Sequence, residues 1–188
     1  MKMNSDAKIF KMISLRKMIL LVLIAVLLVA LICQLAISGA NDGYTLKLKD
    51  GFDKVLIKKG LDAQNPSVVF EKQGDEWFVR QDFAGNAPSE KFQADSNVCL
   101  RIEDFFSKIE VVGVVSRTSD DERFGFGENS VFVTASKDGK ILRQVEIGKN
   151  AATDQQVYCK IDGKHEVFLV SGNQRSLFDR EFDRFKLN

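Results

Sequence analysis

The sequence predicts an α+β domain that follows one N-terminal transmembrane helix. Three observations lead to this prediction. They are an almost unbroken apolar run over Met18–Ile37, short segments that alternate apolar and polar residues between Asp-Gly turns, and two segments with helical spacing of apolar residues. Alternation is typical of half-buried strands, and apolar residues three or four positions apart are typical of an amphipathic helix. Strands joined as hairpins, with few helices between them, favour a mostly antiparallel sheet.

The apolar run predicts a transmembrane helix over residues 18–38. About 20 apolar residues, each rising about 1.5 Å, span a hydrocarbon core about 30 Å thick. Asp6 and five cations precede the run, and no cation follows it until Lys47; the five are Lys2, Lys8, Lys11, Arg16 and Lys17. Lys and Arg stay on the cytoplasmic side. We therefore expect a cytoplasmic basic tail (1–17), a signal-anchor helix (18–38) in the cytoplasmic (inner) membrane, and an extracytoplasmic domain (39–188), which is periplasmic in a Gram-negative-type cell.

Two alternatives to a retained anchor follow from the same region. Ser38 and Ala40 are small residues placed for a signal-peptide cut after Ala40. The run is longer than the usual 7–15-residue signal core, which favours the anchor. A lipoprotein signal ending at Cys33 is disfavoured because Ile32 is bulky and Cys33 lies deep in the run.

Composition limits the class of the expected external domain. It has the usual size of one domain. Residues 1–38 carry a net +4 from five cations and one anion, whereas residues 39–188 carry −3 from 22 cations and 25 anions. A mildly acidic domain offers no electrostatic footprint for nucleic acid. Fourteen of the 15 Phe lie in it and, with Trp77, predict one aromatic-rich core. Cys99 and Cys159 either form one disulfide or are two buried thiols.

The first half of the domain predicts a meander followed by a helix. Strands are expected over residues 44–49, 54–58, 67–72 and 77–80. Asp95 and Ser96 are good N-caps for a helix whose apolar face continues to Ile109. A valine-rich strand over 111–116 and a short helix over 118–124, ending at Gly125, are expected next.

The second half predicts two hairpins and a final helix. Asp138-Gly139 joins strands over 131–136 and 140–147, and Asp162-Gly163 joins strands over 156–161 and 164–170, because Asp-Gly permits type I′ turns. The final helix is expected over 174–186, with its apolar face at Leu177, Phe178, Phe182 and Phe185. The strands are thus expected in two meander or hairpin groups, with a central and a C-terminal helix.

Few residues suggest a chemistry. His165 is the only histidine, and with Cys159 it gives half a metal site, but zinc needs three or four ligands, so a solvated turn histidine is favoured. Residues 120–122 are acidic, and helix capping explains them better than a cation site does. Residues 125–127 lack the Lys-Ser/Thr of a phosphate loop. Trp77 and Tyr158 are candidates for stacking on a sugar or peptide, with core packing as the simpler interpretation.

A family pattern covers roughly Asp53 to Lys186. Its motifs are a lone-Trp strand (Gly74–Val79), a helix opening at Ala94-Asp95, the turn Phe124-Gly125-Phe126, the strand end Ile147-Gly148, and the strand residue Tyr158. Their order resembles the bacterial family catalogued as domain of unknown function 4340. The Pro often found near Trp77 and after the aromatic-Gly turn in that family is missing here. The resemblance implies an anchored envelope protein, with some members beside ABC-transporter components, and brings no catalytic residues.

These observations predict an anchored extracytoplasmic interaction or accessory domain, not an enzyme, without cofactor or metal. The expected partner is an envelope protein such as an ABC-transporter permease. The alternatives are an extracytoplasmic ligand- or carbohydrate-binding domain that uses Trp77 or Tyr158, and a hydrolase that depends on His165.

Overall fold

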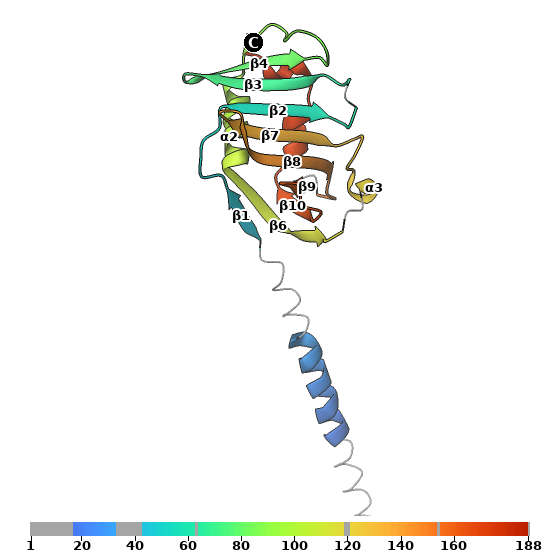
Figure 1. Cartoon of the computed structure of the whole chain (residues 1–188). Coiled ribbons are helices and arrows are strands. Elements are labelled where there is room, and N and C mark those ends of the chain that lie inside the picture. The colour runs from blue at the N-terminus through green and yellow to red at the C-terminus, as the bar shows by residue number, and fades with distance from the viewer. Residues whose placement is uncertain (1–16, 33–42, 63, 119–120, 154, 188) are drawn as a thin grey trace, which may run out of the picture. The chain divides into compact units, whose positions relative to one another are not determined.

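The computed structural model describes residues 17–32, 43–62, 64–118, 121–153 and 155–187. The chain divides into two units, Met1–Asp42 and Gly43–Asn188. In the first unit, the described residues form a helix over 17–32, the blue coil in Figure 1. None of the helices in the described ranges is both long and apolar enough for a membrane crossing. Cys33, Ser38 and Ala40, on which the end of the anchor and its alternatives depend, lie outside the described residues.

The second unit is built on ten strands. Their bounds are β1 Tyr44–Lys47, β2 Lys54–Lys59, β3 Ser67–Gln73, β4 Glu76–Asp82, β5 Phe92–Gln93, β6 Lys108–Ser116, β7 Val131–Lys137, β8 Lys140–Asn150, β9 Gln156–Ile161 and β10 Val167–Ser171. The helices of this unit are α2 Ser96–Ser107, α3 Asp121–Phe124, α4 Gln174–Phe178 and the 3₁₀ turn η2 Phe182–Phe185. The α+β class and the mostly antiparallel sheet are confirmed.

All ten strands belong to one sheet, in the order β1-β6-β10-β9-β8-β7-β2-β3-β4-β5. Each neighbouring pair is antiparallel. The two expected groups are both present, as the runs β2-β3-β4-β5 and β7-β8-β9-β10, and they lie in one sheet. The first meander and the second join because β2 pairs with β7, for example Leu56 with Thr134, and β1 is carried to the far edge, where it pairs with β6. Figure 1 shows the strands side by side in this order.

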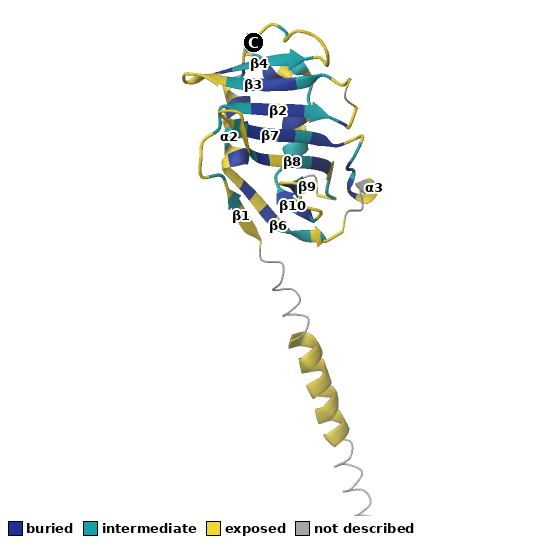
Figure 2. Ribbon diagram, viewed as in Figure 1, coloured by how far each residue is buried: buried dark blue, intermediate teal, exposed yellow. Residues whose placement is uncertain are grey.

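The helices α2 and α4 and the turn η2 pack on one face of this sheet, called here the covered face. Inward residues of the central strands, such as Val55, Val133 and Cys159, are fully buried there (Figure 2). Helix α2 contributes a buried stripe of Val98, Cys99, Ile102, Phe105 and Phe106. Phe105 packs against Phe178 of α4 with ring centroids 5.1 Å apart. The aromatic-rich core is thus one cluster between the sheet and its helices, as predicted.

The helix ends differ from their predicted positions. Asp95 caps α2 as expected, since its carboxylate accepts hydrogen bonds from the backbone N–H groups of Asn97 (2.7 Å) and Val98 (3.3 Å). The helix stops at Ser107, however, and Ile109 lies in β6, because the strand begins earlier than its valine run suggests.

The predicted final helix is broken. Helix α4 ends at Phe178, and the turn η2 begins at Phe182. The break places residues 185–187 beside β5: Asp95 N–H donates to the Phe185 carbonyl (2.9 Å), and Leu187 N–H donates to the Gln93 carbonyl (2.9 Å). An extended strand-like ending covers the β5 edge of the sheet in a way that a continuous helix would not.

Candidate functional site

The second face of the sheet, called here the open face, carries a hollow of about 350 Å³ over β7, β8 and β9. Its lining comprises Phe132, Val133, Thr134, Gln144, Val145, Glu146, Lys160, Gly163, Lys164 and His165. The first seven of these residues lie in β7, β8 and β9, which the sequence predicted as strands, and the last three belong to the turn after β9. Because side chains alternate along a strand, Phe132 and Thr134 face this hollow while Val131 and Val133 are buried beneath it.

Charged groups at the hollow are held by their neighbours. The Glu146 carboxylate accepts a hydrogen bond from Gly127 N–H (3.2 Å). The Lys160 ammonium lies 4.0 Å from Glu146 and 4.6 Å from the centre of the Phe126 ring. These side chains are only 14% (Lys160) and 18% (Glu146) exposed, so their charges are fixed in place. The arrangement can bind a polar partner.

Beside the hollow, a small aromatic cluster joins the turn after α3 to β8, β9 and β10. Its buried members are Phe124, Phe126 and Val167, with Tyr158 packed against them. Gly148 makes this approach possible, because a Cβ at that position would lie 2.3 Å from the Phe124 carbonyl oxygen. Gly125, at φ +74°, turns the chain between the two Phe residues. Three motifs of the family pattern, those at 124–126, 147–148 and 158, therefore meet at one place.

Tyr158 is half-buried in this cluster. Its ring meets the Phe124 ring edge to face, with centroids 4.9 Å apart. The contact uses the ring for packing and leaves the side chain only partly accessible. Tyr158 therefore contributes to the wall beside the hollow, and it does not line the hollow itself.

Trp77 lies in the core of the covered face and reaches a separate hollow of about 300 Å³. The side chain is 9% exposed. Its indole Nε1 donates a hydrogen bond to the Glu103 carboxylate (2.9 Å), and the Lys72 ammonium lies 5.5 Å from the ring centre. Asp75, Glu76 and Glu103 line the same hollow. The structure thus brings Trp77 beside carboxylates but does not bring Trp77 and Tyr158 into one site.

His165 and the two described cysteines differ in burial. His165 is exposed in the turn after β9, whereas Cys159 is fully buried in the core. Both described cysteines are free thiols, which resolves the alternative left open by the sequence. Burial, reinforced by Glu103 and Asp95, raises the pKa of Cys99 to about 12, and burial also raises the pKa of Cys159. Among the described residues, no three His, Cys, Asp or Glu side chains gather to hold a metal ion.

The acidic and glycine-rich motifs around α3 form a turn. Asp120 lies outside the described residues. The short predicted helix is confirmed in part: it begins at Asp121 and ends at Phe124. Gly125 N–H donates to the Glu122 carbonyl (3.3 Å), and both Gly125 and Gly127 have positive φ. This geometry agrees with the expected turn at residues 125–127.

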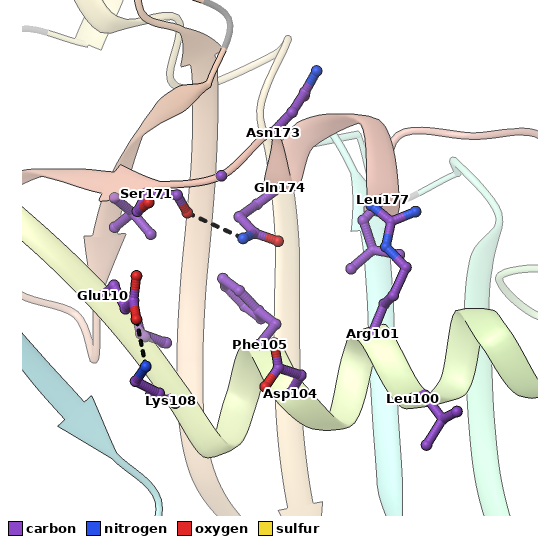
Figure 3. A pocket seen from close by; sticks show the side chains of 13 residues that line it. Leu100, Arg101, Asp104, Phe105, Lys108, Glu110, Ser171, Asn173, Gln174 and Leu177 are labelled. Atoms are coloured by element: carbon purple, nitrogen blue, oxygen red, sulfur yellow. Dashed lines mark hydrogen bonds and ion pairs between the residues drawn. The ribbon is translucent and has the colours of Figure 1, made fainter.

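Sequence reasoning missed a third hollow of about 460 Å³ on the helix side of the sheet (Figure 3). It lies between α2, the start of β6 and the turn that follows β10. Lys108 and Glu110 form an ion pair at its rim, and the Gln174 side chain donates to the Ser171 carbonyl (3.1 Å). Strand β6 extends past the end of β10, whose last pairing with β6 is Val170 with Val111. Gly172, at φ +87°, turns the chain away from β6 at that point. This glycine was the sequence signal that could have indicated the hollow.

One comparison with known proteins gives a match. A family model described as "Domain of unknown function (DUF4340)" matches residues 86–186, a little over half of the chain. The resemblance read from the motifs is thereby confirmed, although the match begins at residue 86 and not near Asp53. No curated protein and no solved structure matches the chain.

Proposed function

Since the chain belongs to the DUF4340 family, a domain family of unknown function, we propose that it is a single-pass membrane-anchored accessory protein. In this proposal its folded unit (43–188) lies outside the cytoplasmic membrane and binds another envelope protein through the open face. An ABC-transporter-type complex is the proposed assembly. That part of the proposal rests on the family resemblance alone.

The observation that carries the anchor is the helix over residues 17–32. Its large apolar side chains are between 45% and 65% exposed, from Ile24 to Leu21. Leu, Ile and Val side chains each favour insertion into hydrocarbon by roughly 0.3–0.6 kcal/mol. A helix with this surface is stable beside lipid tails and unfavourable in water. The apolar sequence continues to Ile37.

Charge supports the proposed orientation. The cations of the chain's first 17 residues are those that the positive-inside rule keeps in the cytoplasm. The folded unit follows the helix and carries a net negative charge. In this orientation the sheet lies on the opposite side of the membrane from the basic tail.

The composition of the open face supports the proposal of a protein partner. It presents a hollow with an exposed Gln144 and half-buried Phe132 and Thr134 at its centre. Leu56 on the neighbouring strand is 36% exposed. A surface that mixes apolar side chains with a few fixed charges is typical of the contact regions of non-obligate protein complexes.

Thiol labelling in intact cells tests the proposal. The native thiols Cys99 and Cys159 are buried, so a membrane-impermeant maleimide should react only with an introduced cysteine. In a Cys33→Ser background, Lys140→Cys at the exposed start of β8 should be labelled from outside and Lys8→Cys only after lysis. Labelling of Lys8→Cys in intact cells, or recovery of the chain in the soluble fraction, would overturn the proposal.

A specific observation also favours the ligand-binding alternative. The hollow at Trp77 places an aromatic edge beside Asp75, Glu76 and Glu103, a combination that recognises sugars or cationic groups. Trp77 is the only Trp, so its fluorescence reports on this hollow alone. Saturable quenching by soluble oligosaccharides, lost in Glu103→Gln, is the expected result; an unchanged spectrum would dismiss this alternative.

A further inference from the structure

An arginine cluster lies where the C-terminal segment crosses α2. A hollow of about 420 Å³ is lined there by Asp95, Val98, Ser176, Arg180, Arg184 and Lys186. Asp95 caps the helix, and Lys186 is paired with Asp183 at 2.7 Å. Arg180 and Arg184 are left facing a polar, accessible recess on the helix side of the sheet. The open face and its proposed partner are not involved.

Arg180 is held in position by the backbone. Its Nε and Nη2 atoms both donate to the Ser176 carbonyl, at 3.2 Å and 3.1 Å. Its guanidinium also lies 5.8 Å from the centre of the Phe185 ring. These contacts use one edge of the guanidinium fork and fix its plane. Nη1 makes none of these bonds, so a donor of a pre-positioned cation remains for a ligand.

The charges around Arg180 are mostly of the same sign. Burial lowers the pKa of Arg180, and the nearby Arg101 and Arg184 lower it further, while Asp95 acts in the opposite direction. Within the described residues, none of these three arginines forms an ion pair, whereas Arg175 in the same segment pairs with Asp179 at 3.2 Å. The lining of the hollow carries three cations (Arg180, Arg184 and Lys186) and one carboxylate (Asp95), an excess of two positive charges in a unit that is acidic overall.

We propose that this hollow binds a phosphate-type oxyanion between the guanidinium groups of Arg180 and Arg184. A doubly charged oxyanion matches the excess charge, and its several oxygens accept from more than one planar guanidinium fork at once. The ligand is either a soluble phosphate compound or the phosphate of a lipid headgroup. Binding of the oxyanion reduces the electrostatic repulsion between the arginine side chains. A purely structural role for the cluster gives no reason for these like charges to lie together.

Titration of the full chain in a neutral detergent with inorganic phosphate tests the site. Calorimetry should show saturable binding with a dissociation constant of about 1 mM or tighter. Arg184→Gln should weaken binding by about fivefold or more, the effect of one exposed charge pair at the upper end of its range. Arg117→Gln removes an exposed arginine that directly follows β6 and should leave binding unchanged.

A second arm distinguishes the two sources of phosphate. Hydrogen exchange over residues 176–186 is compared in nanodiscs of phosphatidylcholine with and without phosphatidylglycerol. Protection that requires phosphatidylglycerol and is lost in Arg184→Gln assigns the site to a lipid headgroup. Saturable phosphate binding in detergent, without that protection, assigns it to a soluble phosphate compound.

Two results would overturn the site. One is the absence of both phosphate binding and lipid-dependent protection. The other is an equal response of Arg184→Gln and Arg117→Gln. Thermal unfolding of each variant shows whether it is folded; because Arg184 and Arg117 are exposed, we expect both variants to unfold at the temperature of the native chain.

Discussion

The covered and open faces of the sheet are built from the same strands but have different roles. Along β7, Val131, Val133 and Ala135 are buried under the helices, while Phe132, Thr134 and Ser136 between them are half-exposed. The covered face holds the aromatic core, and the open face holds ion pairs, a hollow and a small aromatic cluster. One set of alternate residues therefore stabilises the domain, while the other set leaves a surface for binding.

The largest effect is expected from the covered face. Phe106 is fully buried and contacts Phe52, Phe105 and Phe178. Phe106→Ala should lower the free energy of unfolding by about 3–5 kcal/mol, because it removes a large buried ring and leaves a cavity. Urea unfolding of the full chain in detergent measures this change. Phe132→Ala, its counterpart on the open face, should cost clearly less; an equal loss for the two would remove the distinction between the faces.

A smaller effect on stability is expected in the small aromatic cluster of the open face. Gly148→Ala would place a Cβ against the Phe124 carbonyl and the Phe126 ring. The resulting displacement of the turn after α3 should cost about 1–3 kcal/mol. It should also raise the exposure of Tyr158, which near-ultraviolet circular dichroism detects. Gly139→Ala is the control, since no atom lies within 4 Å of its Cβ and any loss there reflects only its positive φ.

The ion pairs of the open face should contribute about 1 kcal/mol and depend on pH. Burial alone would raise the pKa of Glu71, but hydrogen bonds from Lys91, Arg80 and Lys54 outweigh it and lower this pKa to about 2. A folded-state pKa below the unfolded one stabilises the protein above about pH 4.5, and this contribution is lost as the pH falls towards 2. The side chain is partly screened by solvent, which limits the effect to about 1 kcal/mol.

Glu71→Gln checks this contribution. The variant should be less stable than the native chain at pH 7, and the two unfolding free energies should converge near pH 2. The exposed Glu90→Gln should follow the native curve throughout. A constant difference between Glu71→Gln and the native chain from pH 7 to pH 2 would mean that the charge of Glu71 is not what stabilises this face.

The smallest effect on stability is expected at the centre of the open face. Thr134 is half-exposed beside the hollow. Thr134→Lys should change the free energy of unfolding by no more than about 0.5 kcal/mol. It should nevertheless reduce the recovery of the proposed envelope partner after gentle solubilisation, since a charge is inserted into the proposed contact. Unchanged recovery would show that the partner does not bind at this hollow.

Local patterns in the sequence predicted most elements of the covered face. The N-cap at Asp95 and the spacing from Val98 to Phe106 identified α2, and the Asp-Gly turns at 138–139 and 162–163 have the positive φ angles that their residue types favour. Strand β5 was missed because Phe92-Gln93 is too short to show alternation. The break after Phe178 was missed because Phe182 and Phe185 keep a helical spacing in a 3₁₀ turn as well.

Long-range pairing and the hollows were less accessible to sequence reasoning. Nothing local in Leu56 or Thr134 indicates that their strands pair across almost 80 residues and merge two meanders into one sheet. Tyr158 and Trp77 were predicted as candidates from residue type alone, and the structure places them on opposite faces of the sheet. The arginine cluster was missed because Arg180 and Arg184 form a hollow with Asp95 and Val98 only after the C-terminal segment folds back over α2.

Site-specific photo-crosslinking tests the central claim, that the anchored domain acts through its open face. A photoreactive residue is placed at Gln144, exposed on the open face, and in a second strain at Asn97, exposed on the helix side. We predict an adduct with an envelope membrane protein from position 144 and none from position 97. An adduct from position 97 alone, or from neither position in intact cells, would contradict the account.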